Sequence, residues 1–233
     1  MRRKPIRKTG EDLRDFPTYT IPEAAVILGL PPRTVREWFS GDDAVLSPAG
    51  SIGGLPLLSF KDALDVYALF LLRSLHNFSM QSIKSAMEAM SRHTQAKHVV
   101  SEHLSVFKDH LLLEMPKRQN RERQLVDLSV HGDQLAIPGI VDVFSNRVLR
   151  TGAGEISALF PWRLWKQDQA SKPVQINPEI MSGRLVVTGT RIPVSMIHDR
   201  VKRGQSLSFI ASDYGIPVDR VDKALKHLDQ KAA

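Results

Sequence analysis

The stretch that decides the fold is residues 176–228, INPEIMSGRLVVTGTRIPVSMIHDRVKRGQSLSFIASDYGIPVDRVDKALKHL. The β-branched residues on both sides of Gly189 predict two short strands joined by a tight turn. A first helix is predicted over residues 194–203, because Val194, Ile197 and Val201 recur at spacings of three and four. These features predict a compact unit that begins with a hairpin and continues with helices.

Two further helices follow in the same stretch. Ser206 is a good N-cap for the first of them. The second begins after Gly215-Ile216-Pro217 and places Val221, Leu225 and Leu228 on one face. Two short helices joined by a glycine-containing turn are typical of a helix-turn-helix. The residues leave open a generic three-helix unit.

The segment GRLVVTGTRIPVS, followed by GQSLSFIASDYGIPVDRVDKAL, resembles a small domain family with a glycine, a β-hairpin with a GTR turn and a trihelical unit. That family resembles VapB-type antitoxins, which occur beside genes for PIN-type ribonuclease toxins. The resemblance covers about a quarter of the chain. It implies an antitoxin whose partner is a PIN-type ribonuclease toxin.

A second motif is residues 19–40, YTIPEAAVILGLPPRTVREWFS. Thr20 and Glu23 have the spacing of a capping box, with Pro22 at the start of the helix. Gly29-Leu30-Pro31 predicts the turn, and Pro32 opens a second helix. In a helix-turn-helix the start of that helix enters the major groove, where arginine can pair with guanine. The candidate DNA-binding residues are Arg33, Thr34, Arg36 and Glu37, and the alternative is a helical hairpin with a solvated charged face.

A glycine-rich segment, residues 41–58, and a capping-box pattern at Ser59 and Asp62 follow this motif. The run from TIPEAAVILGLPPRTVREWF to LLSFKDALDVYALFLLRSLHNFSMQSIKSAME resembles the MerR winged-helix family. The resemblance implies a wing and DNA binding. The chain lacks that family's long dimerisation coiled coil and any cysteine metal site, which argues against a metal or small-molecule sensor.

The middle of the chain, residues 92–165, contains two apolar stretches separated by the basic segment 117–123. They predict a hairpin with a long loop, which either contacts phosphate or is solvated. Trp162 and Trp165 either belong to the core or anchor a partner, since interfaces are rich in tryptophan. A linker is predicted over residues 166–174.

The net charge of +7 indicates an anionic partner, most simply nucleic acid. The arm at residues 1–18 is basic, and its alternative to binding DNA is a solvated end. It has no apolar run behind it, so it is not a signal peptide. There are no cysteines, which fits a reducing cytoplasm and excludes disulfides. We therefore expect a cytoplasmic protein that does not associate with membranes.

No constellation for catalysis is present. A phosphate-binding GxxxxGK[ST] loop and a GxSxG nucleophile elbow are both absent from the sequence. His93, His98 and His103 are spaced by five, so they do not share one face of a helix, and each is interpreted as a solvated or core histidine. The sequence predicts no enzyme activity, no cofactor and no metal site.

The predicted fold is α+β and mainly helical, with a winged helix-turn-helix, a middle β-hairpin segment, and a C-terminal β-hairpin with three helices. The predicted domains are a basic arm (1–18), a MerR-like DNA-binding domain (19–91), an α/β middle segment (92–165), a linker (166–174) and an antitoxin-like domain (175–233).

Two functional hypotheses follow. In the first, the protein is a type II antitoxin that represses its own operon on double-stranded operator DNA and inhibits a PIN-type ribonuclease. In the second, it is a transcription regulator in which Asp219, Arg220, Lys223 and Lys226 read DNA as well. A homodimer is expected in both. The candidates for contact with the toxin or DNA are Trp162, Trp165, Arg184, Arg191, Arg200, Lys202, Arg203, Arg220 and Lys223.

Overall fold

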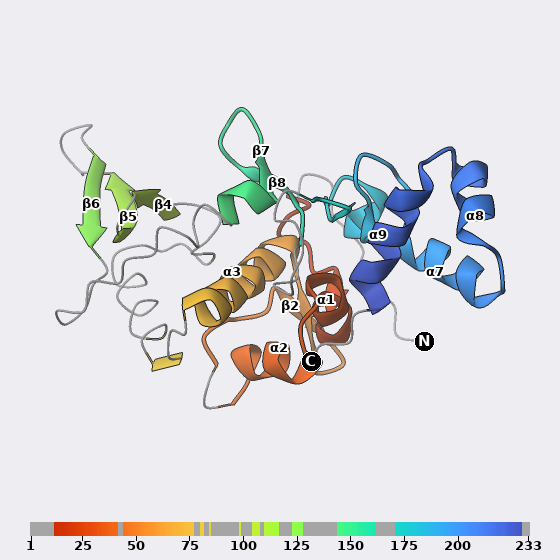
Figure 1. The fold of residues 1–233 in the computed structure, drawn as a ribbon. Helices are drawn as coiled ribbons and strands as arrows, with labels where there is room; N and C mark the ends of the chain where they lie inside the picture. The colour runs from red at the N-terminus through yellow and green to blue at the C-terminus, as the bar shows by residue number, and fades with distance from the viewer. Residues whose placement is uncertain are drawn as a thin grey trace.

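The computed structural model has an α+β, mainly helical fold, as predicted (Figure 1). Among the residues it describes, no helix is both long enough and apolar enough to cross a bilayer. The described residues are 12–41, 44–76, 80–81, 84, 98, 104–107, 110–116, 123–127, 144–161 and 171–229.

The N-terminal unit is a winged helix-turn-helix, drawn in red to orange in Figure 1. Both halves of the predicted capping box form, since Glu23 N–H donates to Thr20 Oγ1 and Thr20 N–H donates to Glu23 Oε2. The strands form an antiparallel sheet in the order β1-β3-β2, and β2 and β3 make the wing. The elements are β1 (Tyr19–Thr20), α1 (Ile21–Leu28), α2 (Pro32–Phe39), β2 (Gly50–Ile52), β3 (Leu55–Leu58) and α3 (Phe60–His76).

The middle segment contains a three-stranded antiparallel sheet in the order β4-β5-β6. Pro116 pairs with Arg123, so β5 and β6 form a hairpin across the basic segment, which confirms the predicted hairpin. Residues 144–147 form one helical turn. The strands are β4 (Leu104–Phe107), β5 (His110–Pro116) and β6 (Arg123–Asp127).

Two small antiparallel pairs connect the middle of the chain to its C-terminal unit. The first pair is β7 and β8, and the second is β9 and β10. An isolated antiparallel bridge between Leu159 and Ile176 joins the two pairs. The strands are β7 (Val148–Arg150), β8 (Ile156–Leu159), β9 (Val174–Gln175) and β10 (Val186–Val187).

The C-terminal unit differs from the prediction in its hairpin. The turn at Gly189 forms, with φ at 71°, but β10 pairs with β9 and not with a strand after the turn. The expected return strand is reduced to one bridge, Val186 to Pro193. Pro193 has no N–H for a ladder and instead precedes a helix that begins at Val194. The helices are α7 (Val194–Lys202), α8 (Leu207–Tyr214) and α9 (Val218–Asp229), as predicted.

The N-terminal and C-terminal units share one apolar core. The Tyr19 hydroxyl donates to the Gly183 carbonyl at 2.7 Å, and both residues are buried. On α9, His227 Nε2 lies 2.9 Å from the Ile27 carbonyl on α1. These contacts join residues 164 and 200 positions apart in the chain. The two units therefore pack as one body.

Candidate nucleic-acid and partner interface

The exposed face of α2 carries the residues predicted to contact DNA. Val35 and Trp38 are buried against the core, at 0% and 2% exposure, which fixes the rotation of the helix. Arg33 and Glu37 lie outside and form an ion pair at 2.8 Å, and Arg36 is also exposed. The hydrogen bond to the Glu37 carboxylate raises the pKa of Arg33. The helix thus presents two permanently charged guanidinium groups to solvent.

The first turn of α2 is open to an anion. Pro31 occupies the N-cap position and, in the described structure, no side chain caps this helix. Backbone N–H groups at a helix start bind phosphate oxygens well. Residues 12–76 contain eight Asp or Glu and five Lys or Arg, so the unit as a whole is not basic. The positive charge that would meet a phosphate is therefore local, at Arg33 and Arg36, with Thr34 half-buried between them.

The α8–α9 pair repeats the α1–α2 pair in register, 186 positions later. Ser206 caps α8 as Thr20 caps α1, and each first helix has eight residues. Gly29 and Gly215 both end their helices in the left-handed conformation, with φ at 72° and 63°. In each unit a proline, Pro31 or Pro217, lies two positions after this glycine. The chain therefore contains two helix-turn-helix units of the same local design.

The buried positions of the two units also correspond. Val35 matches Val221, and both are 0% exposed. Ala25 matches Ala211, and Trp38 matches Ala224, all at 2% exposure or less. Few residues are identical between the two units, so the correspondence lies in the caps, the glycine turns and the buried positions.

The exposed positions carry opposite charges. Asp219 and Asp222 occupy the places that Arg33 and Arg36 occupy in the first unit. Their side chains are 65% and 37% exposed. Carboxylates at these positions repel the phosphates of DNA. The second unit thus shares the local design of the first, but it presents the carboxylates of Asp219 and Asp222, which pair with Lys223 and Lys226, where the first presents arginines.

Two of the predicted cationic contacts are engaged within the protein. Arg200 pairs with Asp213 at 2.5 Å, and its guanidinium lies between the rings of Phe209 and Tyr214. The hydrogen bond to Asp213 raises the pKa of Arg200. Arg220 donates to the carbonyl of Thr188 and so fastens α9 to the Gly189 turn. Both side chains hold the C-terminal unit together.

The other C-terminal candidates are exposed to solvent. Lys223 lies 3.7 Å from Asp219 on the same helix. Trp162, Trp165 and residues 1–11 of the predicted basic arm (1–18) lie outside the described residues, whereas Thr18 N–H donates to the Leu58 carbonyl. The exposed set is Arg184, Arg191, Lys202, Arg203 and Lys223.

A groove of about 950 Å³ lies between the two units. One wall comes from the segment 13–27, and the other includes Ser182 and Gly183 of the loop Met181–Gly183. All three residues of that loop have positive φ, at 50°, 54° and 77°. Non-glycine residues adopt this conformation at a cost, and it often occurs at functional sites. Gly183, the first residue of the segment GRLVVTGTRIPVS, is the one sign of this loop in the sequence.

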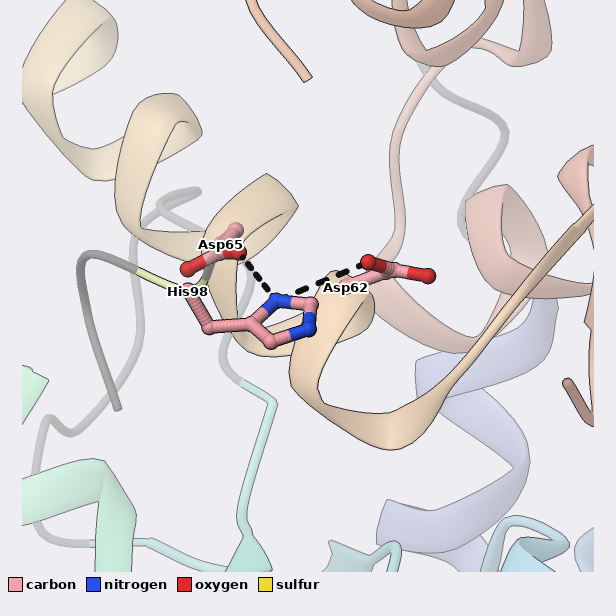
Figure 2. A group of neighbouring side chains, drawn as sticks. All are labelled: Asp62, Asp65 and His98. Atoms are coloured by element: carbon pink, nitrogen blue, oxygen red, sulfur yellow. Dashed lines mark hydrogen bonds and ion pairs between the residues drawn. The ribbon is translucent and has the colours of Figure 1, made fainter. Parts of the chain in front are cut away.

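Three buried titratable side chains, not predicted to interact, meet beside α3 (Figure 2). His98 Nδ1 lies 2.9 Å from Asp65 Oδ2 and 3.6 Å from Asp62 Oδ1. His98 is 6% exposed, which confirms that it is a core histidine. His93 and His103 lie outside the described residues.

Comparisons with known proteins agree on fold and leave function open. Residues 174–227 match a family described as "Protein of unknown function (DUF433)". No curated protein matches the chain. The chain is similar to the X-ray crystal structure of Rv2018 from Mycobacterium tuberculosis, with 18% identity and a TM-score of 0.63. That similarity covers 90% of this chain and 97% of the other, so the whole fold, and not only the DUF433 segment, is shared.

Proposed function

We propose that this protein is the antitoxin of a type II toxin–antitoxin pair. It binds operator DNA through α2 and inhibits a PIN-type ribonuclease through its C-terminal unit. The observation that carries the proposal is the charge difference between two matched helix-turn-helix units. Arg33 and Arg36 in the first become Asp219 and Asp222 in the second. The first helix-turn-helix unit is therefore suited to bind DNA, and the second is suited to bind a protein.

In the DNA complex, α2 lies in the major groove with its first turn toward the bases. Arg33 or Arg36 donates to a guanine edge, and the open N–H groups of the first turn bind a phosphate. Glu37 holds Arg33 through the ion pair described above. The β2–β3 wing lies beside the groove, as in other winged helices.

In the toxin complex, cationic side chains of the C-terminal unit lie against the toxin's carboxylates. The resemblance to VapB-type antitoxins implies a PIN-type nuclease as the partner. Such nucleases use clustered carboxylates and a divalent metal. A guanidinium placed there displaces the metal or blocks the RNA. Arg184, Arg191, Lys202 and Arg203 are the exposed side chains suited to this role.

A second candidate function, a regulator with two DNA-reading units, is favoured by the matched register of the two helix pairs. The salt dependence of operator binding separates the two functions. Each lost phosphate contact lowers the slope of log K against log salt by about 0.9. Lys223→Ala leaves this slope unchanged if the protein is an antitoxin and lowers it if α9 contacts DNA. Lys223 is preferred to Arg220 for this test, because Arg220 also supports the Gly189 turn.

Arg33→Ala or Arg36→Ala is expected to weaken operator binding by about 5- to 150-fold, the loss of a base contact. Binding is measured by fluorescence anisotropy on the promoter of the protein's own operon, at a fixed salt concentration. The matched control is Arg191→Ala, an exposed arginine in the other unit, which is expected to bind DNA as the wild type does. Wild-type affinity and footprint in both α2 variants would remove this helix from the interface.

The inhibitory role is tested by co-expression with the neighbouring small open reading frame. The wild type is expected to restore growth, and the variant Arg184→Glu/Arg191→Glu is expected to fail, since its charges repel the toxin's carboxylates. Arg33→Ala/Arg36→Ala serves as the control, which should lose operator binding and still protect. Protection by the Arg184→Glu/Arg191→Glu variant would refute the role of this face, and a harmless neighbouring gene would refute the antitoxin proposal.

A further inference from the structure

Asp62 and Asp65 on α3 and the more distant His98 converge around one small volume (Figure 2). One donor atom from each lies within 4.8 Å of the other two. Asp62 and Asp65 are three positions apart on α3, so they share a face of the helix. In metal sites with bonds of about 2.0–2.2 Å, neighbouring donor atoms lie about 3–3.5 Å apart. The separations of 2.9 Å and 3.6 Å around His98 Nδ1 are close to that range, and the shorter one is the hydrogen-bond distance between His98 and Asp65.

The surrounding contacts orient two of these ligands. Asp62 Oδ2 accepts hydrogen bonds from the N–H groups of Ala49 and Ser59, which leaves Oδ1 toward His98. On the other side of the ring, His98 Nε2 lies 3.9 Å from Asp15 Oδ1. At that distance Asp15 acts on the imidazole through its charge and not through a direct hydrogen bond, and its carboxylate accepts a hydrogen bond from Lys61 Nζ at 2.8 Å.

The charge balance favours a dication. The carboxylates of Asp62 and Asp65 are nearly excluded from water, at 2% and 4% exposure. Burial of a carboxylate is costly unless a positive charge offsets it. Within the cluster, a protonated His98 offsets one of the two negative charges, whereas a divalent cation offsets both and leaves the imidazole neutral.

We propose that Asp62, Asp65 and His98 bind one divalent transition-metal ion, with water completing the coordination. One imidazole and two carboxylates suit Zn²⁺ or Mn²⁺. The ion ties α3 to residue 98 and, through Asp15, to the segment before β1. This site departs from the expectation, drawn from the sequence, that no metal is bound. It does not depend on the proposed antitoxin function.

The test uses the full-length, tag-free protein after chelator treatment and Zn²⁺ as the probe. Titration against a chromogenic chelator is expected to give one Zn²⁺ per chain. Asp65→Asn and His98→Gln are each expected to weaken binding by about 100-fold or more, and Asp15→Asn by about 10-fold. The control is His198→Gln, a histidine on α7 away from the cluster in sequence, which should bind as the wild type does. Co²⁺ should give a visible absorption band that Asp65→Asn abolishes.

Absence of Zn²⁺ binding in the wild type, or equal affinity in Asp65→Asn, would overturn the proposal. The three residues would then form an imidazolium hydrogen-bonded between carboxylates. Asparagine matches aspartate in size, and circular dichroism of the Asp65→Asn variant distinguishes lost binding from lost folding.

Discussion

Gly183→Ala is expected to reduce the free energy of unfolding by about 3 kcal/mol. Gly183 has φ at 77°, where an L side chain costs about 1–2 kcal/mol. An added Cβ would also lie 2.3 Å from the hydroxyl of Tyr19, which donates to the Gly183 carbonyl. Tyr19 is 4% exposed, so moving its ring would disturb the packing around it. Its displacement would break a buried hydrogen bond between the two units.

Urea unfolding measures this effect, and Gly152→Ala is the matched control. Gly152 is exposed with open space around it, so its substitution should change stability by less than about 0.5 kcal/mol. Tyr19→Phe removes the clashing hydroxyl, so the double variant should cost less than the two single variants together. A loss below about 1 kcal/mol for Gly183→Ala would contradict the described contact.

Asp62→Ala is expected to reduce the free energy of unfolding by about 3 kcal/mol, because it leaves the buried N–H of Ser59 and the partly buried N–H of Ala49 without their acceptor. Ser59 and Asp62 form a capping box at the start of α3, and Ser59 is 0% exposed. Water cannot replace the lost carboxylate there. The measurement is made with a chelator present, so that no bound cation contributes to stability.

Glu23→Ala removes the corresponding carboxylate from the capping box of α1, and Glu23 is exposed. Water can replace that carboxylate, so the expected cost is about 1 kcal/mol. The comparison isolates the effect of burial on one motif. Equal losses in the free energy of unfolding for Asp62→Ala and Glu23→Ala would show that the hydrogen bonds of Asp62 stabilise the fold no more than the exposed ones of Glu23.

The local parts of this fold could be predicted from the sequence. Capping boxes at Thr20 and Ser59 are set by residues three positions apart, and glycine turns by a single residue. The same holds for the exposed face of α2, since the spacing of Val35 and Trp38 determines which side chains point outward. Short-range physics decides each of these features.

The contacts between distant residues could not be predicted. Tyr19 and Gly183 are 164 positions apart, and nothing near either one specifies the other. The spacing of the histidines predicts only that His98 is a solvated or core residue, whereas its partners Asp62 and Asp65 lie on a helix more than thirty residues earlier. The internal contacts of Arg200 and Arg220 could not be predicted either. The sequence does not show whether a charged side chain pairs within the protein or with another molecule.

The shared core has a consequence for how such chains are assembled in evolution. Tyr19, Ile27 and Phe60 line the same groove as Leu185 and Leu228. A gene rearrangement that carried only the segment 174–227 into another protein would uncover apolar surface on it. Any such transplanted copy would need polar replacements on that face, or a new neighbour of similar shape to cover it.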